Sequence, residues 1–551
     1  MQKKEGSMMK QIYDYIIVGA GTSGPIVASR LSEDPHVSVL LLEAGGENIN
    51  DISRAPGAFF KVWGTDYDWQ YETEPQKGLN NRKIYAPRGR VVGGSSAINV
   101  GFWMRGTRED YDFWEQQGAK GWNYEKALKM FQKIEDTDLG PTRYRGKGGM
   151  VHLEDSAYPS EFTQTQFDAF KEAGFGDIGD FQAEDPYCAD IVQKDYINRV
   201  RHTPADSYLS EEVRKRPNLT VQTDTFVRKV IFKENRAVGV EVEYKGELQQ
   251  VEARAEVILS AGSFNTAQIL KLSGVGPKKE LARHGIPVVA DVPGVGENLN
   301  DHLMVNVRAL SSVPIPDTHF NPISDESLAQ WRKEQTGPAC YYPGPAAGLV
   351  SSDGTHTGPD FEMILQYVHT ANGSEKEFAG VENIAERSGY SFPVILMIPK
   401  SRGTVLLASG DPHDKPLIDP NYFDDPSDMK RFIKGIRYAL QLTQTTALSP
   451  YTEMVHPALD ASDADIEAFI RNEASTVFHP VGTARIGDLE KDPMAVVDSH
   501  LRVRGVEGLR VADASIMPQV NRGHTMAPVT YIGEMAAQII QSETDRPYQR
   551  S

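Results

Sequence analysis

The chain has 551 residues, of which 40% are hydrophobic, and its formal net charge is -18 at pH 7. This length suggests two to four domain-sized units with large hydrophobic cores. The surplus of acidic residues argues against nucleic acid or an anionic membrane surface as a partner, because binding to either requires a basic surface. Cys188 and Cys340 are the only cysteines, so no disulfide framework holds the fold together.

The sequence contains no run of about 18 apolar residues, and no apolar segment near its N-terminus has the form of a signal peptide. We therefore expect a cytoplasmic protein without a membrane span. The sequence also predicts no metal site.

A strand, helix, strand unit is predicted near the N-terminus. Residues 15–18 have the length and β-branching of a buried parallel strand, and residues 19–24 read GAGTSG, a GxGxxG motif. A helical pattern follows, and then a second apolar run at residues 37–42 that ends at Glu43. A carboxylate at this position can accept hydrogen bonds from both hydroxyls of an adenosine ribose. The unit therefore predicts a dinucleotide whose pyrophosphate lies at the helix N-terminus.

A second glycine-rich segment occurs at residues 88–106, where Gly93-Gly94-Ser95-Ser96 combines small side chains with backbone donors. Such a segment can press against a flat ring or a phosphate. The apolar spacing over residues 111–135 then predicts one helix.

The middle of the chain alternates strands and turns. Residues 219–223, 227–232 and 237–244 are expected to form an antiparallel meander that ends in the buried strand 257–260. A glycine turn and a predicted helix at residues 266–273 follow this strand directly. We expect this segment to return to the dinucleotide-binding sheet and to bring a second backbone loop to the cofactor.

Beyond His302 the chain is punctuated by proline and glycine. Strands of a separate sheet are predicted at residues 361–368, 394–399 and 404–409, and a long helix at residues 426–443. We interpret this part as a second domain and expect a substrate cavity between it and the dinucleotide domain.

Two histidines near the C-terminus are candidates for catalysis. His479 lies beside Pro480, and His524 lies in a second turn. Histidine is suited to take a proton from an alcohol as hydride leaves the same carbon, although either residue taken alone could be structural. Asp513 follows the apolar run 509–512 and could bind the sugar-like chain of a cofactor, or it could be an acid of a surface turn.

Taken together, these motifs resemble the glucose-methanol-choline (GMC) oxidoreductases over nearly the whole chain. The segments that carry the resemblance are residues 15–24 with Glu43, the first signature at 88–106, the second signature at 262–276, the stretch 294–302 and the histidine motif 479–483. The resemblance implies a mixed α/β (α+β) fold with a Rossmann-like βαβ FAD-binding domain and an antiparallel-sheet substrate-binding domain. The FAD-binding domain is expected at residues 8–157, 203–305 and 476–546, and the substrate-binding domain at 158–202 and 306–475.

The resemblance also implies the chemistry. FAD is expected to accept hydride from an alcohol carbon onto N5, with His479 as the principal base and His524 helping to hold the substrate oxygen. Val477 and Phe478 are expected on the substrate side, with Val477 affecting the access of oxygen. The expected FAD-binding residues are Gly19, Gly21, Thr22, Ser23, Gly24, Glu43, Ala44, Arg88, Val92, Gly93, Gly94, Ser95, Asn99, Val100, Gly101, Val227, Ala261, Gly262, Asp513, Ala514, His524, Thr525 and Met526.

Two positions depart from the family pattern. Ile98 stands where members that link FAD covalently can carry a histidine, so non-covalent FAD is expected. Pro25 directly after the fingerprint is less usual, but proline suits the first turn of a helix.

The favoured interpretation is oxidation of a primary alcohol to the aldehyde, with the electrons passing to O2 or another acceptor. An NAD-dependent dehydrogenase remains an alternative, since GxGxxG and an acid fit NAD equally well, as does a flavin-binding protein that does no chemistry. A choline-type dehydrogenase would need an aromatic cage and a carboxylate, for which Trp331, Tyr341 and Tyr342 are candidate rings. An uncharged alcohol, such as an aromatic or furanic one, is preferred because His524 rather than asparagine fills the paired position.

Overall fold

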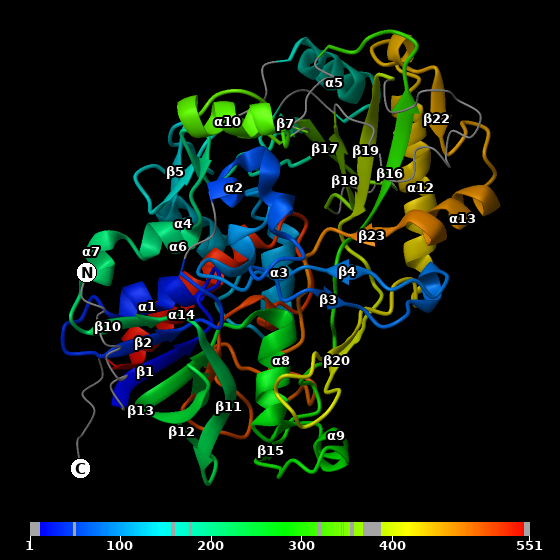
Figure 1. Ribbon diagram of the computed structural model, residues 1–551. Coiled ribbons are helices and arrows are strands. Elements are labelled where there is room, and N and C mark those ends of the chain that lie inside the picture. Colours follow the sequence, from blue (N-terminus) through cyan, green and yellow to red (C-terminus); the bar gives the residue numbers. More distant parts are fainter. Residues whose placement is uncertain are drawn as a thin grey trace.

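The fold contains two large sheets that lie in different parts of the molecule (Figure 1). It is described by a computed structural model for residues 12–47, 51–155, 160–175, 179–316, 322–342, 344, 346–352, 358–366 and 387–544. Each of the two sheets has seven strands and its own hydrophobic core.

The first sheet is centred on β1 (Ile12–Val18), which is buried because its apolar residues face neighbours on both sides. Its strand order is β10-β2-β1-β13-β12-β11, with β24 (Leu509–Val511) beside β13. Along it, β1 runs parallel to β2 (Val39–Leu42) and to β13 (Glu247–Leu259). Helix α1 (Gly24–Leu31) joins β1 to β2, with Pro25 in its first turn, so the predicted strand, helix, strand unit is confirmed.

The predicted meander is wrong in its first strand. β10 (Leu219–Gln222) pairs in parallel with the edge of β2, and only β11 (Thr225–Lys233), β12 (Arg236–Tyr244) and β13 form an antiparallel meander. The chain changes direction at Asp224, which has a φ of 53°. β10 pairs with this edge because β2 is fully buried, and its backbone N–H and C=O groups would otherwise lack hydrogen-bond partners on that side.

The helix expected at residues 111–135 is two helices, α3 (Arg108–Gln116) and α4 (Tyr124–Ile134). Between them, Gly118 and Gly121 have positive φ angles of 99° and 82°, which end the first helix. The side chain of Asn123 then accepts from the backbone N–H of Lys126 and begins the second.

The second sheet is antiparallel, as predicted. Its order is β22 (Met454–His456), β16 (Leu303–Leu310), β19 (Gly389–Leu396), β18 (Phe361–Leu365), β17 (Ala346–Val350) and β7 (Ala189–Ile191), with β23 (Ser475–Thr476) also paired to β16. The end of the strand expected at 361–368 lies outside the described residues. β20 (Thr404–Leu406) was expected in this sheet, but it pairs with β21 (Leu417–Asp419) in a separate hairpin.

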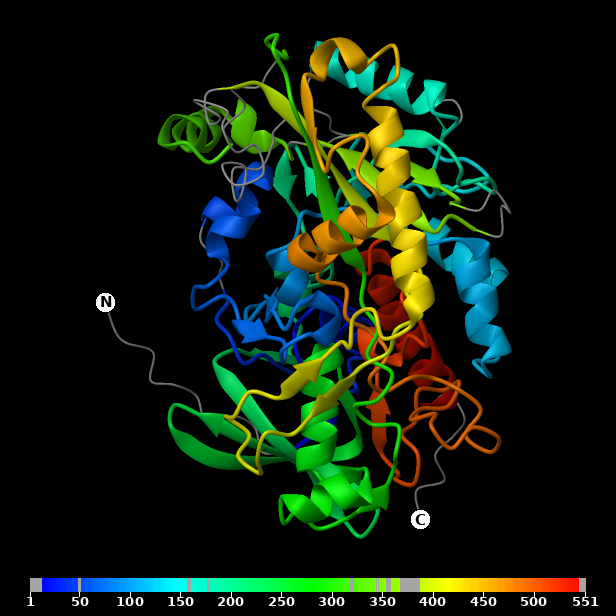
Figure 2. The same ribbon diagram turned by 90° about the vertical axis from the view of Figure 1, so that its right-hand side faces the viewer.

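The expected long helix is α12 (Pro426–Leu442), which runs along this sheet (Figure 2). Gly435 allows the close approach, since a Cβ there would lie 2.6 Å from the ring of Phe361. The predicted helix after β13 is α8 (Gly262–Leu272), and the last helix, α14 (Met526–Thr544), packs beside α1. The boundaries of the two domains remain a prediction.

Smaller elements connect these parts. Other helices are α2 (Asp51–Arg54), α5 (Glu161–Glu172), α6 (Pro204–Tyr208), α7 (Glu211–Arg214), α9 (Lys278–Arg283), α10 (Asp325–Glu334) and α13 (Asp463–Glu473). Short strand pairs are β3 (Tyr71–Glu72) with β4 (Tyr85–Ala86), β5 (Glu135–Thr137) with β6 (Val151–Leu153), β8 (Tyr196–Ile197) with β9 (Val200–Arg201), and β14 (Val275–Gly276) with β15 (Ala290–Asp291).

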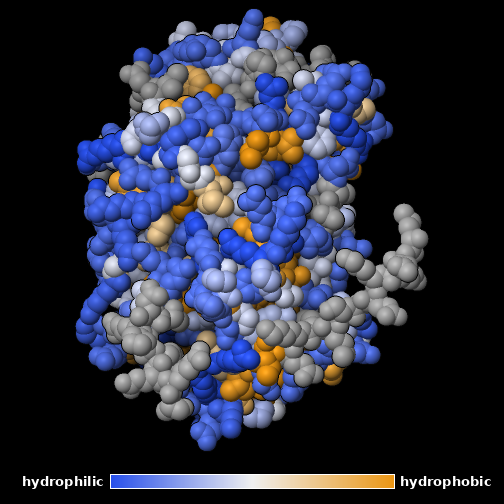
Figure 3. Space-filling model, turned by 90° about the vertical axis from the view of Figure 1, so that its left-hand side faces the viewer, coloured by the Kyte–Doolittle hydropathy of each residue, from blue (hydrophilic) through white to orange (hydrophobic). Residues whose placement is uncertain are grey.

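One face of the molecule is mostly hydrophilic, and hydrophobic side chains form only small separate patches on it (Figure 3). Among the helices in the described ranges, none combines the length and the apolar character that crossing a membrane requires.

Candidate active site and cofactor cavity

A long cavity lies between the first sheet and the second, and both contribute to its wall. At one end it is lined by the GxGxxG turn and Glu43, and it also reaches His479, His524 and residues of the second sheet. Most of the residues expected to bind FAD line it, but four do not. These four are Gly24, Val92, Gly93 and Gly101.

The glycines form a cradle in which side chains would not fit. A Cβ on Gly24 would lie 2.0 Å from the carbonyl oxygen of Gly19, and a Cβ on Gly94 would lie 2.7 Å from the Cα of Gly21. The first signature therefore packs directly against the dinucleotide fingerprint. Gly21, Thr22 and Ser23, directly before α1, line the cavity beside this contact.

Glu43 is a buried carboxylate in the cavity wall. One of its oxygens accepts from the backbone N–H of Ala20 at 3.0 Å, and the other accepts from Gly45 at 2.9 Å. Burial raises the pKa of Glu43 to about 7, although these backbone hydrogen bonds act in the opposite direction. Each oxygen keeps a further lone pair for another donor.

Asp513 is 2% exposed, so the surface-turn interpretation is wrong. Its side chain accepts from the N–H of Gly262 at 2.9 Å and from the hydroxyl of Thr266 at 2.6 Å, both at the start of α8. The Asp513 carboxylate thus fixes the second glycine turn beside the cavity.

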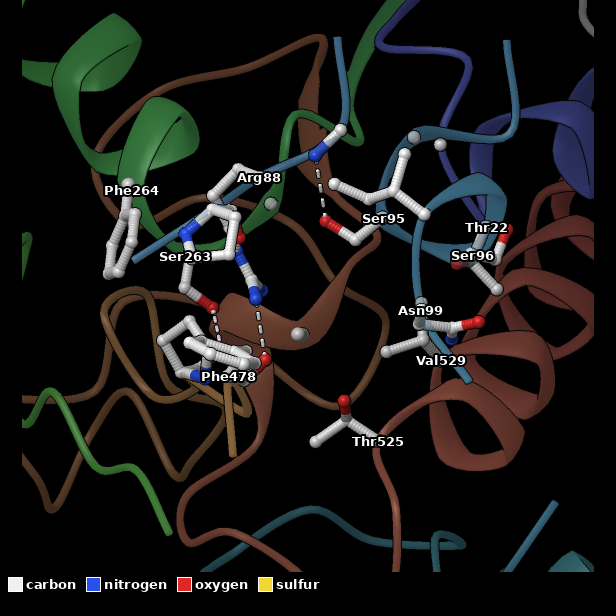
Figure 4. Close-up of a pocket in the computed structure, with 18 of the residues that line it drawn as sticks. Thr22, Arg88, Ser95, Ser96, Asn99, Ser263, Phe264, Phe478, Thr525 and Val529 are labelled. Carbon is white, nitrogen blue, oxygen red and sulfur yellow. Dashed lines mark hydrogen bonds between the residues drawn. The ribbon is translucent and has the colours of Figure 1, made fainter. Parts of the chain in front are cut away.

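Arg88 lies where the first signature meets the histidine motif. Figure 4 shows its guanidinium directed at the backbone oxygen of Phe478, to which it donates at 2.6 Å. Burial lowers the pKa of Arg88 to about 10, so the side chain remains a cation near neutral pH. Arg88 thereby holds the backbone next to His479 and adds positive charge beside it.

The structure brings the two predicted histidines together. The ring centroids of His479 and His524 are 4.8 Å apart, and the rings are nearly perpendicular. Burial lowers the pKa of His479 well below its usual value, and His524, His302 and Arg88 lower it further. His479 is therefore a neutral imidazole at neutral pH, as a proton acceptor must be.

Sequence reasoning missed three residues that support these histidines. Asp301 accepts from the backbone N–H of His479 at 2.8 Å, and Nδ1 of His302 lies 2.9 Å from Nδ1 of His479. Glu362, on β18, contacts Nε2 of His524. The stretch 294–302 was recognised as a recurrent segment, but nothing in it indicates that its last two residues contact His479.

Aromatic rings surround the cavity beside the two histidines. Phe478 contacts Trp63, Trp63 contacts Phe59, Phe59 contacts Tyr342, Tyr342 contacts Phe102, and Phe102 contacts His524, with centroid distances of 5.0, 5.5, 6.3, 5.2 and 5.1 Å. We call these rings the aromatic belt. With the two histidines they form a continuous chain of ring contacts from Phe478 to His479, and such a wall suits a flat or apolar substrate.

The residues present fit FAD. The backbone of Gly21, Thr22 and Ser23 lines the cavity just before α1, where it would bind a pyrophosphate, and Glu43 is a buried acceptor for ribose hydroxyls. The cavity continues from this end to the histidines, as a cofactor with an adenosine and a ring system at opposite ends requires.

Comparison with known proteins agrees with this geometry. Family models for the N- and C-terminal parts of GMC oxidoreductases match residues 13–304 and 399–533. The chain is 37% identical to an alcohol dehydrogenase [acceptor] of Pseudomonas putida, covering 97% of this chain and 96% of that one. It is 35% identical to an oxygen-dependent choline dehydrogenase of Brucella anthropi, covering 96% of each.

Among solved structures, pyridoxine 4-oxidase from Mesorbium loti superposes with a TM-score of 0.86 at 29% identity, covering 96% of this chain and 99% of that one. GMC oxidoreductases depend on FAD, so the NAD alternative is wrong. The matched residues, the two-sheet fold and the glycine cradle lead to one conclusion: this chain belongs to the GMC oxidoreductases and is an FAD-dependent flavoprotein.

Proposed function

We propose that the protein oxidises an uncharged primary alcohol to the aldehyde. The observation that carries this proposal is the pair His479 and His524 at the cavity, with His479 held neutral. Bound FAD supplies the acceptor for the hydride.

Oxidation of the alcohol requires that an O–H proton and a C–H hydride leave the same carbinol. His479 takes the proton, so that the oxygen can form the carbonyl as the hydride leaves the carbon. His524 holds the oxygen and keeps the carbinol carbon oriented. The two electrons pass on to O2 or another acceptor.

The cavity wall favours an uncharged substrate. Among the described residues that line the cavity, the only carboxylates are Glu43 and Asp513, and both are bonded to groups of the FAD-binding side. The aromatic belt and the apolar side chains of Met304, Ile364 and Ile395 face the remaining space. A ring or a short apolar chain would fit there without leaving a charge unpaired.

A choline-like cation is the second candidate. It is supported by the likeness to choline dehydrogenases and by the buried carboxylate of Glu362, which contacts His524, the histidine that the belt ring Phe102 also contacts. The two candidates are separated by comparing choline with its uncharged isostere, in which a quaternary carbon replaces the nitrogen. We expect the uncharged alcohol to have the higher kcat/KM, and a clear preference for choline would favour the second candidate.

The test of the mechanism is the rate of flavin bleaching by an alcohol without oxygen. His479→Ala should slow it by about 10² to 10⁴-fold, the usual contribution of a positioned base, while FAD stays bound. His524→Asn should cost less, since an amide can still bond the oxygen. The double variant should lose less than the product of the two losses, because groups that act as a unit are not additive.

His500→Ala is the matched control, because His500 is half exposed and pairs with Glu543 away from the cavity. It should reduce its flavin at the wild-type rate. A His479→Ala variant that keeps the wild-type rate would remove His479 as the base, and a larger loss at His524 would exchange their roles.

A further inference from the structure

His302 lies between the histidine motif and the second sheet. It immediately precedes β16 and is completely buried. One ring nitrogen, Nε2, lies 2.7 Å from the carbonyl oxygen of Met397, just after β19. The other, Nδ1, lies 2.9 Å from Nδ1 of His479.

The backbone of Asn521 also acts on the His302 ring, but less than that of Met397, so the contacts with Met397 and His479 indicate which nitrogen carries each hydrogen. A carbonyl oxygen only accepts, so Nε2 of His302 must donate to Met397. Burial lowers the pKa of His302 to about 3, so the ring is neutral and its Nδ1 has a lone pair but no hydrogen. The facing Nδ1 of His479 must then donate, and since His479 is also neutral, its Nε2 has no hydrogen.

We propose that His302 is a positioning residue that holds His479 in the one tautomer able to accept the substrate proton at Nε2. The hydrogen bonds run from His479 Nδ1 to His302 Nδ1, and from His302 Nε2 to the backbone of Met397. Asp301 holds the backbone of His479 in the same place, so two consecutive residues fix both its backbone and its ring. This inference rests on the proposed role of His479 as base.

Protonation of Nε2 in place of Nδ1 would leave His479 unable to act. In a serine protease, loss of the carboxylate that sets the histidine tautomer lowers kcat by about 10⁴-fold. The same reasoning applies here, but the partner is a neutral ring. A neutral partner sets the tautomer without stabilising the protonated histidine, which agrees with a base that must stay unprotonated.

The first test needs no substrate. Holoenzyme labelled with ¹⁵N-histidine should show His479, identified by the signals missing in His479→Gln, with hydrogen on Nδ1 and none on Nε2. Two-bond couplings to the ring protons distinguish the two nitrogens. Hydrogen on Nε2 of His479 would overturn the proposal whatever the activity of the enzyme.

The second test uses variants at His302 and anaerobic flavin bleaching. His302→Asn and His302→Leu have nearly the same shape, but only asparagine keeps an acceptor near the position of Nδ1. Because base catalysis contributes about 10² to 10⁴-fold, the His302→Leu variant should bleach its flavin more than about 10-fold more slowly than the wild type. The rate of the His302→Asn variant should lie between the two. Equal rates for wild type and leucine, alongside a slow His479→Ala, would reject the role of His302 and leave the proposed function intact.

His302→Asp provides a readout that a purely structural role would not move. A carboxylate facing Nδ1 stabilises protonated His479, so the acid limb of bleaching should move to higher pH. The groups that otherwise face His479 are the His524 ring, the Arg88 guanidinium and Asp301 at its backbone, and they are unchanged in this variant. An acid limb that stays in place would contradict the proposal.

FAD content and melting temperature, measured for each His302 variant, show whether a slower rate comes from loss of folding or from a change in the tautomer of His479.

Discussion

Both carboxylate oxygens of Glu362 lie 3.2 Å from Nε2 of His524. An ionised carboxylate only accepts, so His524 donates from Nε2, and Nδ1 is the nitrogen that remains for other partners. Glu362 is 1% exposed and does not line the cavity, so it acts on a substrate only through His524.

We predict that Glu362→Leu slows flavin bleaching about as much as His524→Asn, because His524 loses the acceptor that orients its ring. The buried N–H left without an acceptor also lowers the free energy of unfolding by about 1 to 3 kcal/mol. Glu362→Gln should be milder, since its amide oxygen can still accept. Combined with His524→Asn, the Glu362→Leu change should have little further effect. Asp360→Asn is the control, because Asp360 bonds Ser352 near the same strand. Independent, multiplicative losses would show that Glu362 acts elsewhere.

The affinity for FAD should fall as the pH is lowered through about 7. Ribose hydroxyls donate to ionised Glu43, whereas cofactor-free protein takes up a proton on Glu43 below its pKa of about 7. The Kd of FAD should therefore rise by up to about tenfold for each pH unit below that value. Glu43→Gln should bind FAD more weakly and lose this dependence. Titrations of cofactor-free protein followed by flavin fluorescence measure both, and an unchanged pH profile in Glu43→Gln would exclude Glu43 as the cause.

The stability of the cofactor-free protein should show the opposite trend. Because burial raises the pKa of Glu43 from 4.5 to about 7, its contribution to folding is fully present below 4.5 and is lost as the pH rises through about 7. Denaturant unfolding of the cofactor-free protein should therefore show a decrease in stability over this range that Glu43→Gln lacks. A decrease of the same size in both proteins would assign it to other groups.

Arg105 and Glu135 form a buried ion pair near α4. Their side chains are 4% and 0% exposed, Nε of Arg105 donates to Glu135 at 2.6 Å, and Nε1 of Trp103 donates to the same carboxylate at 2.8 Å. Arg105→Met should lower the free energy of unfolding by about 3 to 5 kcal/mol, because it leaves a buried charge unpaired. Adding Glu135→Leu should restore part of this loss. Denaturant titration with saturating FAD measures both, and an Arg105→Met variant as stable as the wild type would contradict the prediction.

The dinucleotide-binding strand, helix, strand unit could be predicted from local sequence alone. The strand, the glycine turn, the helix and Glu43 are consecutive, and each has its own signature in spacing or residue type. The break between α3 and α4 was also visible in Gly118 and Gly121, but the apolar spacing on either side obscured it.

The partners of the histidines could not be predicted in this way. His302 contacts His479 because β16 begins next to the histidine motif, and Glu362 reaches His524 because β18 lies two strands away from β16 in the same sheet. Such contacts depend on strand order, which hydrophobic periodicity does not encode. The same limit explains β10, whose residues fit a strand but do not reveal its partner.

The GxGxxG turn is tied to the other end of the chain. The hydroxyl of Ser23 donates to the carbonyl oxygen of Ala512 at 2.6 Å, directly after β24, and α14 then packs beside α1. During synthesis this turn therefore emerges long before the residues that complete its surroundings, and β24 can join the sheet only after residues 509–511 have left the ribosome. The complete surroundings of the FAD-binding turn therefore form only after residues 509–544 have been synthesised.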